Sequence, residues 1–209
     1  MKLKNKKILM LILFLFIYQT SLYLIAKITP IEINVVGNAI DNKIPFIPQF
    51  IFAYISWYVM LFLVPYIFYK TNPKSFNKYY ITTFLCITIG LFIYFFYPTT
   101  MYRADIEFKS ISEYLVNIIY KMDTPALNCL PSMHCVISFI FIYVSLTEKN
   151  LNIKYKVLLT IWSLLVIVST LFVKQHVLVD VISAFILSLI VFVLVSNIKY
   201  LKDFDVIKR

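Results

Sequence analysis

The chain has 209 residues, of which 61% are apolar and only 14% are charged, whereas a soluble domain carries about 25% charged residues. This balance excludes a disordered chain and an ordinary cytosolic globule, and it predicts one domain over residues 1–209 that is solvated mainly by lipid. The net charge is +10. Because the basic residues fall in short groups between apolar runs, with no stripe of interleaved aromatic residues, we expect the charge to set membrane topology and expect no nucleic-acid partner.

Glycine is unusually scarce. The chain has only Gly37 and Gly90, where average usage predicts roughly 15 glycines. Two glycines so far apart form neither GxGxxG nor GxxxxGK[ST], which excludes the Rossmann and P-loop nucleotide sites. Any phosphate that this protein binds must therefore be held by side chains and helix ends.

Six apolar segments are long enough, or nearly so, to cross a hydrocarbon core about 30 Å thick. Their apolar residues run on without alternation, which predicts helices and an all-α, polytopic bundle of six transmembrane helices. The first is interpreted as a retained helix, because the apolar run from Ile8 to Ala26 is long for a secretory signal and no A-x-A site follows. The segments cover residues 8–27, 50–69, 79–97, 132–147, 155–173 and 177–196.

Basic residues gather in every second connection of this six-helix topology, while the loops 28–49 and 98–131 are nearly neutral. The positive-inside rule therefore places both termini in the cytoplasm of a cell-membrane protein, and it places the loops 28–49, 98–131 and 174–176 outside. The basic groups are Lys2, Lys4, Lys6 and Lys7; Lys70, Lys74 and Lys78; Lys149, Lys154 and Lys156; and Lys199, Lys202, Lys208 and Arg209.

The long outer loop 98–131 contains a short amphipathic pattern. Ser110 and Glu113 have the spacing of a capping box, and apolar residues then recur at helical spacing from Ile111 to Met122. This pattern predicts a helix that lies on the outer membrane surface. The alternative is a helix that simply covers the bundle.

The two histidines, His134 and His176, both fall at the outer membrane edge in this topology. Histidine is the side chain best suited to proton transfer or nucleophilic attack near neutral pH. His134 follows Pro131 at a predicted helix start, where backbone N–H groups favour anions. Asp180 lies four residues after His176, on the same helix face, where its carboxylate can orient the imidazole ring.

An aspartate in an apolar segment costs roughly 2.5–3.5 kcal/mol at the bilayer centre and less near the edge, so Asp180 is expected to face the bundle and to have a partner. A purely structural explanation treats each histidine as a membrane-boundary residue. That explanation must also account for Asp180, for Arg103 and for Lys174 on the same side of the membrane, so a reactive site is the better hypothesis.

The three cysteines are too few for a disulfide scaffold. Cys86 lies in an apolar run, and Cys129 and Cys135 flank the first histidine motif. A zinc site formed by these two cysteines with His134 and His176 is an alternative, but the C-x2-C and H-x3-H spacings of such sites are absent from the sequence. We therefore interpret the cysteines as reduced packing residues.

Two patterns surround the histidines. The run 131–134 reads P-S-x-H, and a phosphoryl group bound at this helix start would lie beside Ser132. Ser169, His176 and Asp180 match the pattern S-R-x5-H-x3-D, with Thr170 in place of the arginine. In this order the two patterns resemble the type 2 phosphatidic-acid phosphatase superfamily of integral-membrane lipid phosphatases and phosphotransferases. The resemblance covers most of the chain and implies the same six-helix fold.

The first signature of that superfamily, K-x6-R-P, is eroded. Arg103 fits, but Phe96 and Ala104 stand where the lysine and the proline are usual. A phosphate dianion needs several charge-assisted donors, so we expect Lys174 to replace the missing cations. The runs 44–48 and 97–99 also resemble the branch of inositol phosphorylceramide synthase-like proteins.

The resemblance implies a role for each residue. His176 would be the nucleophile that forms a phosphohistidine, with Asp180 orienting it. His134 would be the general acid for the departing group and then the base that activates the acceptor. The residues implied to bind the phosphoryl oxygens are Arg103, Lys174, Ser132 and Ser169.

The same resemblance implies a lipid phosphate substrate in the bilayer, with no metal, no other cofactor and no nucleotide. Water as acceptor would make the protein a phosphatase for a lipid phosphomonoester or pyrophosphate, and an alcohol would make it a phosphotransferase. The spacing of the residues does not choose between the two; we expect the phosphatase as the commoner activity. A non-catalytic transporter is the remaining alternative, but it needs a polar path that the first, fourth and sixth segments do not supply.

Overall fold

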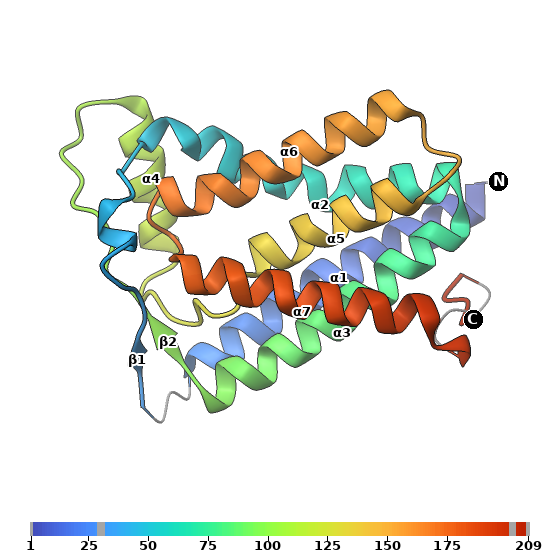
Figure 1. Cartoon of the computed structure of the whole chain (residues 1–209), viewed down its shortest axis with the longest axis horizontal. Coiled ribbons are helices and arrows are strands. Elements are labelled where there is room, and N and C mark those ends of the chain that lie inside the picture. Colours follow the sequence, from blue (N-terminus) through green and yellow to red (C-terminus); the bar gives the residue numbers. More distant parts are fainter. Residues whose placement is uncertain (1, 29–31, 201–203, 208–209) are drawn as a thin grey trace.

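The computed structural model describes residues 2–28, 32–200 and 204–207, with side chains from residue 5 onward. Six long helices lie side by side along the longest axis, and the short helix α4 lies at one end of them (Figure 1). The all-α expectation is confirmed. The helices are α1 (Lys2–Ile28), α2 (Ile51–Thr71), α3 (Pro73–Phe96), α4 (Ile111–Met122), α5 (Met133–Thr147), α6 (Ile153–Phe172) and α7 (Leu178–Asn197), and the strands are β1 (Asn34–Val35) and β2 (Thr99–Thr100).

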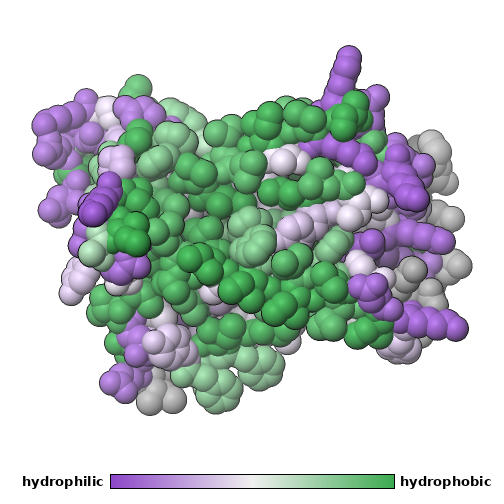
Figure 2. Space-filling model, in the orientation of Figure 1, coloured by the Kyte–Doolittle hydropathy of each residue, from purple (hydrophilic) through white to green (hydrophobic). Residues whose placement is uncertain are grey.

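Five of the helices in the described part of the chain are long and apolar enough to cross a membrane, and Figure 2 shows the apolar belt that they form between two hydrophilic ends. They are the spans Asn5–Ile28, Pro48–Thr71, Pro73–Phe96, Ile153–Phe172 and Leu178–Asn197. The sixth apolar helix, α5, has 15 residues. At 1.5 Å per residue it is about 22 Å long, shorter than a hydrocarbon core of about 30 Å, so the sixth crossing stays a prediction.

Helix α5, the shortest of the six helices along the bundle axis, lies inside the bundle. Most of its side chains are buried, and it packs against α3, α6 and α7. A helix that other helices surround on most sides does not need its whole length matched to the lipid. This position also explains why an apolar run in the sequence gives no clear amphipathic stripe for α5.

The loops segregate to the two ends of the bundle. The start of α1 and the end of α7 lie at one end (Figure 1), where the Glu148 carboxylate accepts hydrogen bonds from Asn72 Nδ2 at 2.9 Å and from the Ser75 hydroxyl. At the opposite end β1 and β2 pair in parallel, and the Asn34 N–H donates to the Pro98 carbonyl at 2.9 Å. The basic and the neutral loops therefore occupy opposite ends, as the predicted topology requires.

The side of the membrane on which each end lies stays an expectation. The structure does not describe all of the basic residues on which this expectation depends. The undescribed parts are the side chains of Lys2 and Lys4 and the residues Lys202, Lys208 and Arg209.

Helix α4 begins where its sequence predicts. The Ser110 hydroxyl caps it by accepting the Glu113 N–H at 3.3 Å. Its inner face buries Val116 and Tyr120 in a cluster with residues of α2, while Ile118 on the outer face is half exposed. Helix α4 thus covers this end of the bundle, and its contact with a membrane surface stays a prediction.

Candidate functional site

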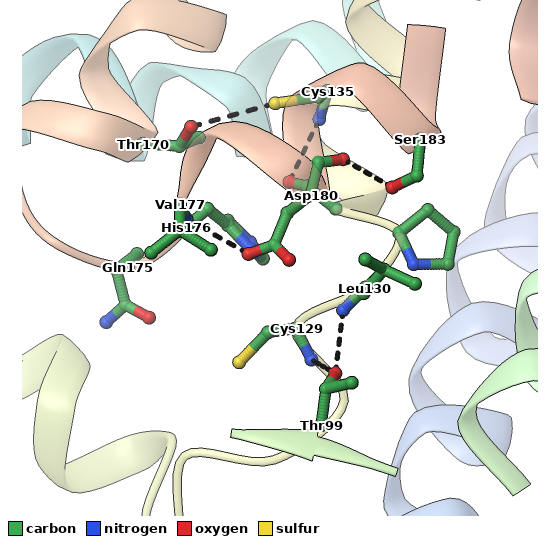
Figure 3. A network of polar contacts seen from close by, with 12 residues as sticks. Thr99, Cys129, Leu130, Cys135, Thr170, Gln175, His176, Val177, Asp180 and Ser183 are labelled. Atoms are coloured by element: carbon green, nitrogen blue, oxygen red, sulfur yellow. Dashed lines mark hydrogen bonds and ion pairs between the residues drawn. The ribbon is translucent and has the colours of Figure 1, made fainter. Parts of the chain in front are cut away.

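His176 and Asp180 form a buried pair at the junction between α6 and α7. Asp180 Oδ2 lies 3.1 Å from His176 Nδ1 and accepts the Val177 N–H at 3.0 Å (Figure 3). The carboxylate is fully buried and the histidine side chain is 10% exposed. Asp180 sits in the first turn of α7 and so also caps the start of the helix. The predicted i,i+4 pairing is therefore present, and it leaves His176 Nε2 as the ring nitrogen not engaged by the aspartate.

His134 faces His176 from the first turn of α5. The two ring centroids lie 6.1 Å apart. The His134 ring stacks on Tyr54, with 4.5 Å between centroids, and lies 4.1 Å from the Trp57 ring, so aromatic side chains of α2 fix its orientation. Its Nε2 atom is buried and has no hydrogen-bond partner among the described residues. Such an atom is expected to meet a ligand.

The two histidine motifs are joined through the backbone. The Ser132 N–H donates to the Asp180 carbonyl at 3.3 Å, and this bond ties the start of α5 to the start of α7. The Ser132 hydroxyl caps α5 by accepting the Cys135 N–H at 3.3 Å. Ser169 donates its hydroxyl to the Val166 carbonyl at 2.6 Å, within α6. Both predicted serines are fully buried and stabilise the helices that build the site; their contact with a phosphate stays a prediction.

Both histidines line one cavity of about 390 Å³. Its walls are mainly apolar and aromatic side chains of α1, α2 and α3, including Leu22, Trp57 and Leu91. The polar groups of the lining include the two histidines, Asp123, Asn128 and Gln175, together with Gln19 and Thr20 of α1. A mostly apolar cavity with a few convergent polar groups is typical of a ligand site.

Several polar atoms of the cavity lining are buried and lack a partner within the described part of the chain. Asn128 is 2% exposed and leaves both amide atoms unpaired, and Gln175 leaves Nε2 unpaired. Both residues line the cavity beside the histidines. Neither residue belongs to a recognised motif, and the signal for each in the sequence is its position next to a histidine motif. Buried amides without partners are costly, so a bound polar group is the natural explanation.

Arg103 reaches the site from the loop after α3. Its guanidinium donates to the Gln175 side-chain oxygen at 3.1 Å and to the Tyr120 carbonyl at 3.0 Å, and it pairs with the Asp123 carboxylate. It also stacks over the Tyr120 ring at 4.7 Å. The structure therefore connects Arg103 to Gln175, the residue before His176. The phosphate-binding role of Arg103 stays a prediction.

Lys174 lies elsewhere. Its φ of 52° is left-handed, and its ammonium donates to the Asp41 carbonyl at 2.9 Å and to the Ile44 carbonyl at 2.6 Å. Lys174 is not among the described residues that line the cavity. Burial lowers the pKa of this ammonium, and the Asp41 carboxylate opposes that effect. In this arrangement Lys174 ties the outer loop to the α6–α7 junction. The expectation that it replaces the missing cations stays a prediction.

Replacing Lys174 with methionine is expected to lower the free energy of unfolding by about 1–2 kcal/mol, because two carbonyls lose their charged donor. Denaturant titration in mixed micelles measures this change, with Lys154→Met, an exposed site on α6, as the matched control. If Lys174→Met instead keeps its stability and loses affinity for phosphate, the ammonium does reach the substrate.

Thr170 occupies the position at which the resembling superfamily carries its second arginine. Thr170 is fully buried, donates to the Ile167 carbonyl at 2.7 Å and lies 3.6 Å from the Cys135 sulfur. The three cysteines are free and buried, and burial together with the Asp180 and Asp123 carboxylates raises the pKa of the Cys129 thiol. No group of three or more histidine, cysteine, aspartate or glutamate side chains in the described ranges is arranged to hold a metal.

A bundle of apolar helices with several candidate membrane spans is typical of a polytopic membrane protein, and in this bundle a His–Asp pair and a second histidine line one cavity. Sequence comparison supplies the family. The PAP2 superfamily model matches residues 98–203, slightly more than half of the chain and both histidine motifs, and the chain belongs to that superfamily. Neither a curated protein nor a solved structure matches the chain.

The resemblance predicted from the histidine motifs is therefore confirmed at the level of the superfamily. Its members are phosphatases or phosphotransferases that act on phosphate esters, which supports an enzymatic function for this chain. The narrower resemblance to inositol phosphorylceramide synthase-like proteins stays a prediction.

Proposed function

We propose that the protein is a membrane lipid phosphatase that hydrolyses a lipid phosphomonoester or pyrophosphate at the outer membrane face through a phosphohistidine. The observation that carries this proposal is the convergence of the His176–Asp180 pair and His134 on one apolar cavity. Superfamily membership supplies the reaction class. The apolar surface between the two hydrophilic ends of the molecule supports a substrate that resides in the bilayer (Figure 2).

The first step uses the free ring nitrogen of His176. Because Asp180 holds Nδ1, Nε2 can attack phosphorus; the N–P bond forms as the bond from phosphorus to the lipid oxygen breaks. His134, across the cavity, gives its proton to the departing oxygen. Arg103 and the amides of Asn128 and Gln175 supply donors for the charge on the phosphoryl oxygens.

The second step releases the phosphate. His134, now neutral, takes a proton from water, the water oxygen bonds to phosphorus, and the N–P bond to His176 breaks. Inorganic phosphate leaves, and the proton on His134 restores the starting state. An alcohol in place of water would give the phosphotransferase reaction with the same residues, and no step requires a metal.

The lining of the cavity supports a lipid rather than a small soluble ester. Apolar side chains of α1 and α3, such as Phe16, Ile87 and Leu91, form an apolar part of this lining. These helices are two of the candidate membrane spans. An acyl or prenyl chain in this part of the cavity would leave its phosphate between the two histidines.

Purified protein in phospholipid vesicles is expected to release phosphate from long-chain lipid phosphates in the presence of a divalent-metal chelator. A soluble short-chain ester with the same phosphate is the matched substrate control and should react much more slowly, because it cannot fill the apolar cavity. Loss of all activity on chelation, restored by zinc, would contradict the mechanism. Transfer of the phosphoryl group to an added alcohol, without free phosphate, would identify a phosphotransferase instead.

A further inference from the structure

Lys27, in the last turn of α1, belongs to a charge cluster beside the site. Its ammonium lies 2.7 Å from Asp123 Oδ1, while Arg103 pairs with Oδ2 of the same carboxylate. The Tyr23 hydroxyl also donates to Asp123. The side chains of Lys27 and Arg103 are only 11% and 14% exposed, and that of Asp123 is 26% exposed. Two cations from separate parts of the chain thus enclose one carboxylate.

The position of this carboxylate is informative. Asp123 lines the same cavity as His134 and His176, and Arg103 also contacts Gln175, the neighbour of His176. Two cations and a hydroxyl that surround one small anion form the kind of donor set that holds a phosphate. The cluster carries two positive charges against one negative charge, so it retains a net charge of +1 for a further anion.

We propose that Lys27 is the second phosphate-binding cation of the site, and that Asp123 holds Lys27 and Arg103 together while the site is empty. When a phosphate monoester binds, both cations turn from the carboxylate to the phosphoryl oxygens. Lys27 then binds the phosphoryl oxygens in place of the signature lysine, whose position in this chain is occupied by Phe96. This inference rests on the proposed phosphatase function for its substrate, but not for its anion site.

If phosphate replaces Asp123 as the partner of the two cations, removing the charge of Lys27 and removing the charge of Asp123 should change phosphate affinity in opposite directions. A phosphate dianion carries more charge and more acceptor oxygens than one carboxylate, so it competes effectively for both cations. The Asp123 carboxylate remains nearby and repels the incoming anion, which weakens binding. Removing the charge of Lys27 should therefore weaken phosphate binding, whereas removing the charge of Asp123 should strengthen it. If the Lys27–Asp123 salt bridge had only a structural role, the two variants would not change phosphate affinity in opposite directions.

Inorganic phosphate is the probe, and its protection of the full-length, detergent-purified protein against thermal unfolding is the measurement. We expect Lys27→Gln to weaken the apparent affinity by about 10-fold or more and Asp123→Asn to strengthen it by a similar factor. Lys27→Arg keeps the charge and should remain close to wild type. Lys121→Gln, at an exposed lysine in the last turn of α4, is the matched control and should change nothing.

Wild-type affinity in Lys27→Gln, or weaker binding in both charge variants, would overturn the inference. If Lys27→Gln does not fold, Asp123→Asn carries the test alone, and unchanged or weaker phosphate binding in it would be decisive against the proposal. If the protein hydrolyses lipid phosphates but Lys27→Gln leaves phosphate affinity and KM unchanged, this inference fails and the proposed function stands. If phosphate protects in the expected pattern but no lipid phosphate is hydrolysed, the function fails and the anion site stands.

Discussion

Replacing His176 with alanine is expected to reduce phosphate release from a lipid phosphate by at least ~10³-fold, because the residue lost is the proposed nucleophile. Asp180 is already buried and hydrogen-bonded to the backbone of Val177, so α7 should keep its start in this variant. Steady-state phosphate release from vesicles measures the effect, and the thermal unfolding midpoint checks that the variant is folded.

Ser183→Ala is the matched control for this substitution. Ser183 lies on α7, and its hydroxyl donates to the Asp180 carbonyl at 3.0 Å, but it is not among the described residues that line the cavity. Its activity should stay within a few-fold of wild type. Substantial activity in a folded His176→Ala protein would show that another residue attacks phosphorus.

Replacing His134 with glutamine is expected to lower turnover of a lipid phosphate by roughly 10²–10⁴-fold, since the leaving alkoxide loses its proton donor and the water loses its base. An aryl phosphate with a good leaving group needs no such proton in the first step. His134→Gln should therefore release one equivalent of the aryl alcohol in a fast burst and then turn over slowly, because the phosphoenzyme accumulates. Rapid-mixing absorbance measurements detect this burst.

The stack of His134 on Tyr54 supplies the control for that experiment. Tyr54→Phe keeps the aromatic surface that orients the ring and should show neither the burst nor the large loss. An equal loss with lipid and aryl substrates in His134→Gln, without a burst, would mean that His134 binds phosphate or supports the fold rather than transferring protons.

The parts of the fold and site that the sequence predicts are those set by local spacing. The apolar runs predict the helices, the spacing of Ser110 and Glu113 predicts the cap of α4, and the i,i+4 spacing of His176 and Asp180 predicts their contact. Each of these depends on the geometry of one or two helical turns. The length of α5 relative to a membrane was harder to predict, because burial by its neighbours relaxes the match to lipid thickness.

The cations of the site depend on contacts distant in sequence, which local patterns do not encode. Lys174 is two residues from His176, yet in the folded chain its ammonium binds the carbonyls of Asp41 and Ile44. Lys27 carries no motif, and it meets Asp123 through the contact between α1 and the outer loop. Proximity in sequence therefore favours Lys174, whereas the contact with Asp123 is the basis for proposing Lys27.

The most direct test of the central claim is to identify the atom that carries the phosphoryl group during turnover. His134→Gln protein mixed with an aryl phosphate and quenched under basic conditions should hold one acid-labile phosphoryl group, and mass spectrometry of its peptides should locate that group on His176. A phosphoryl group on any other residue, or a burst of aryl alcohol with no phosphorylated protein, would contradict the phosphohistidine mechanism.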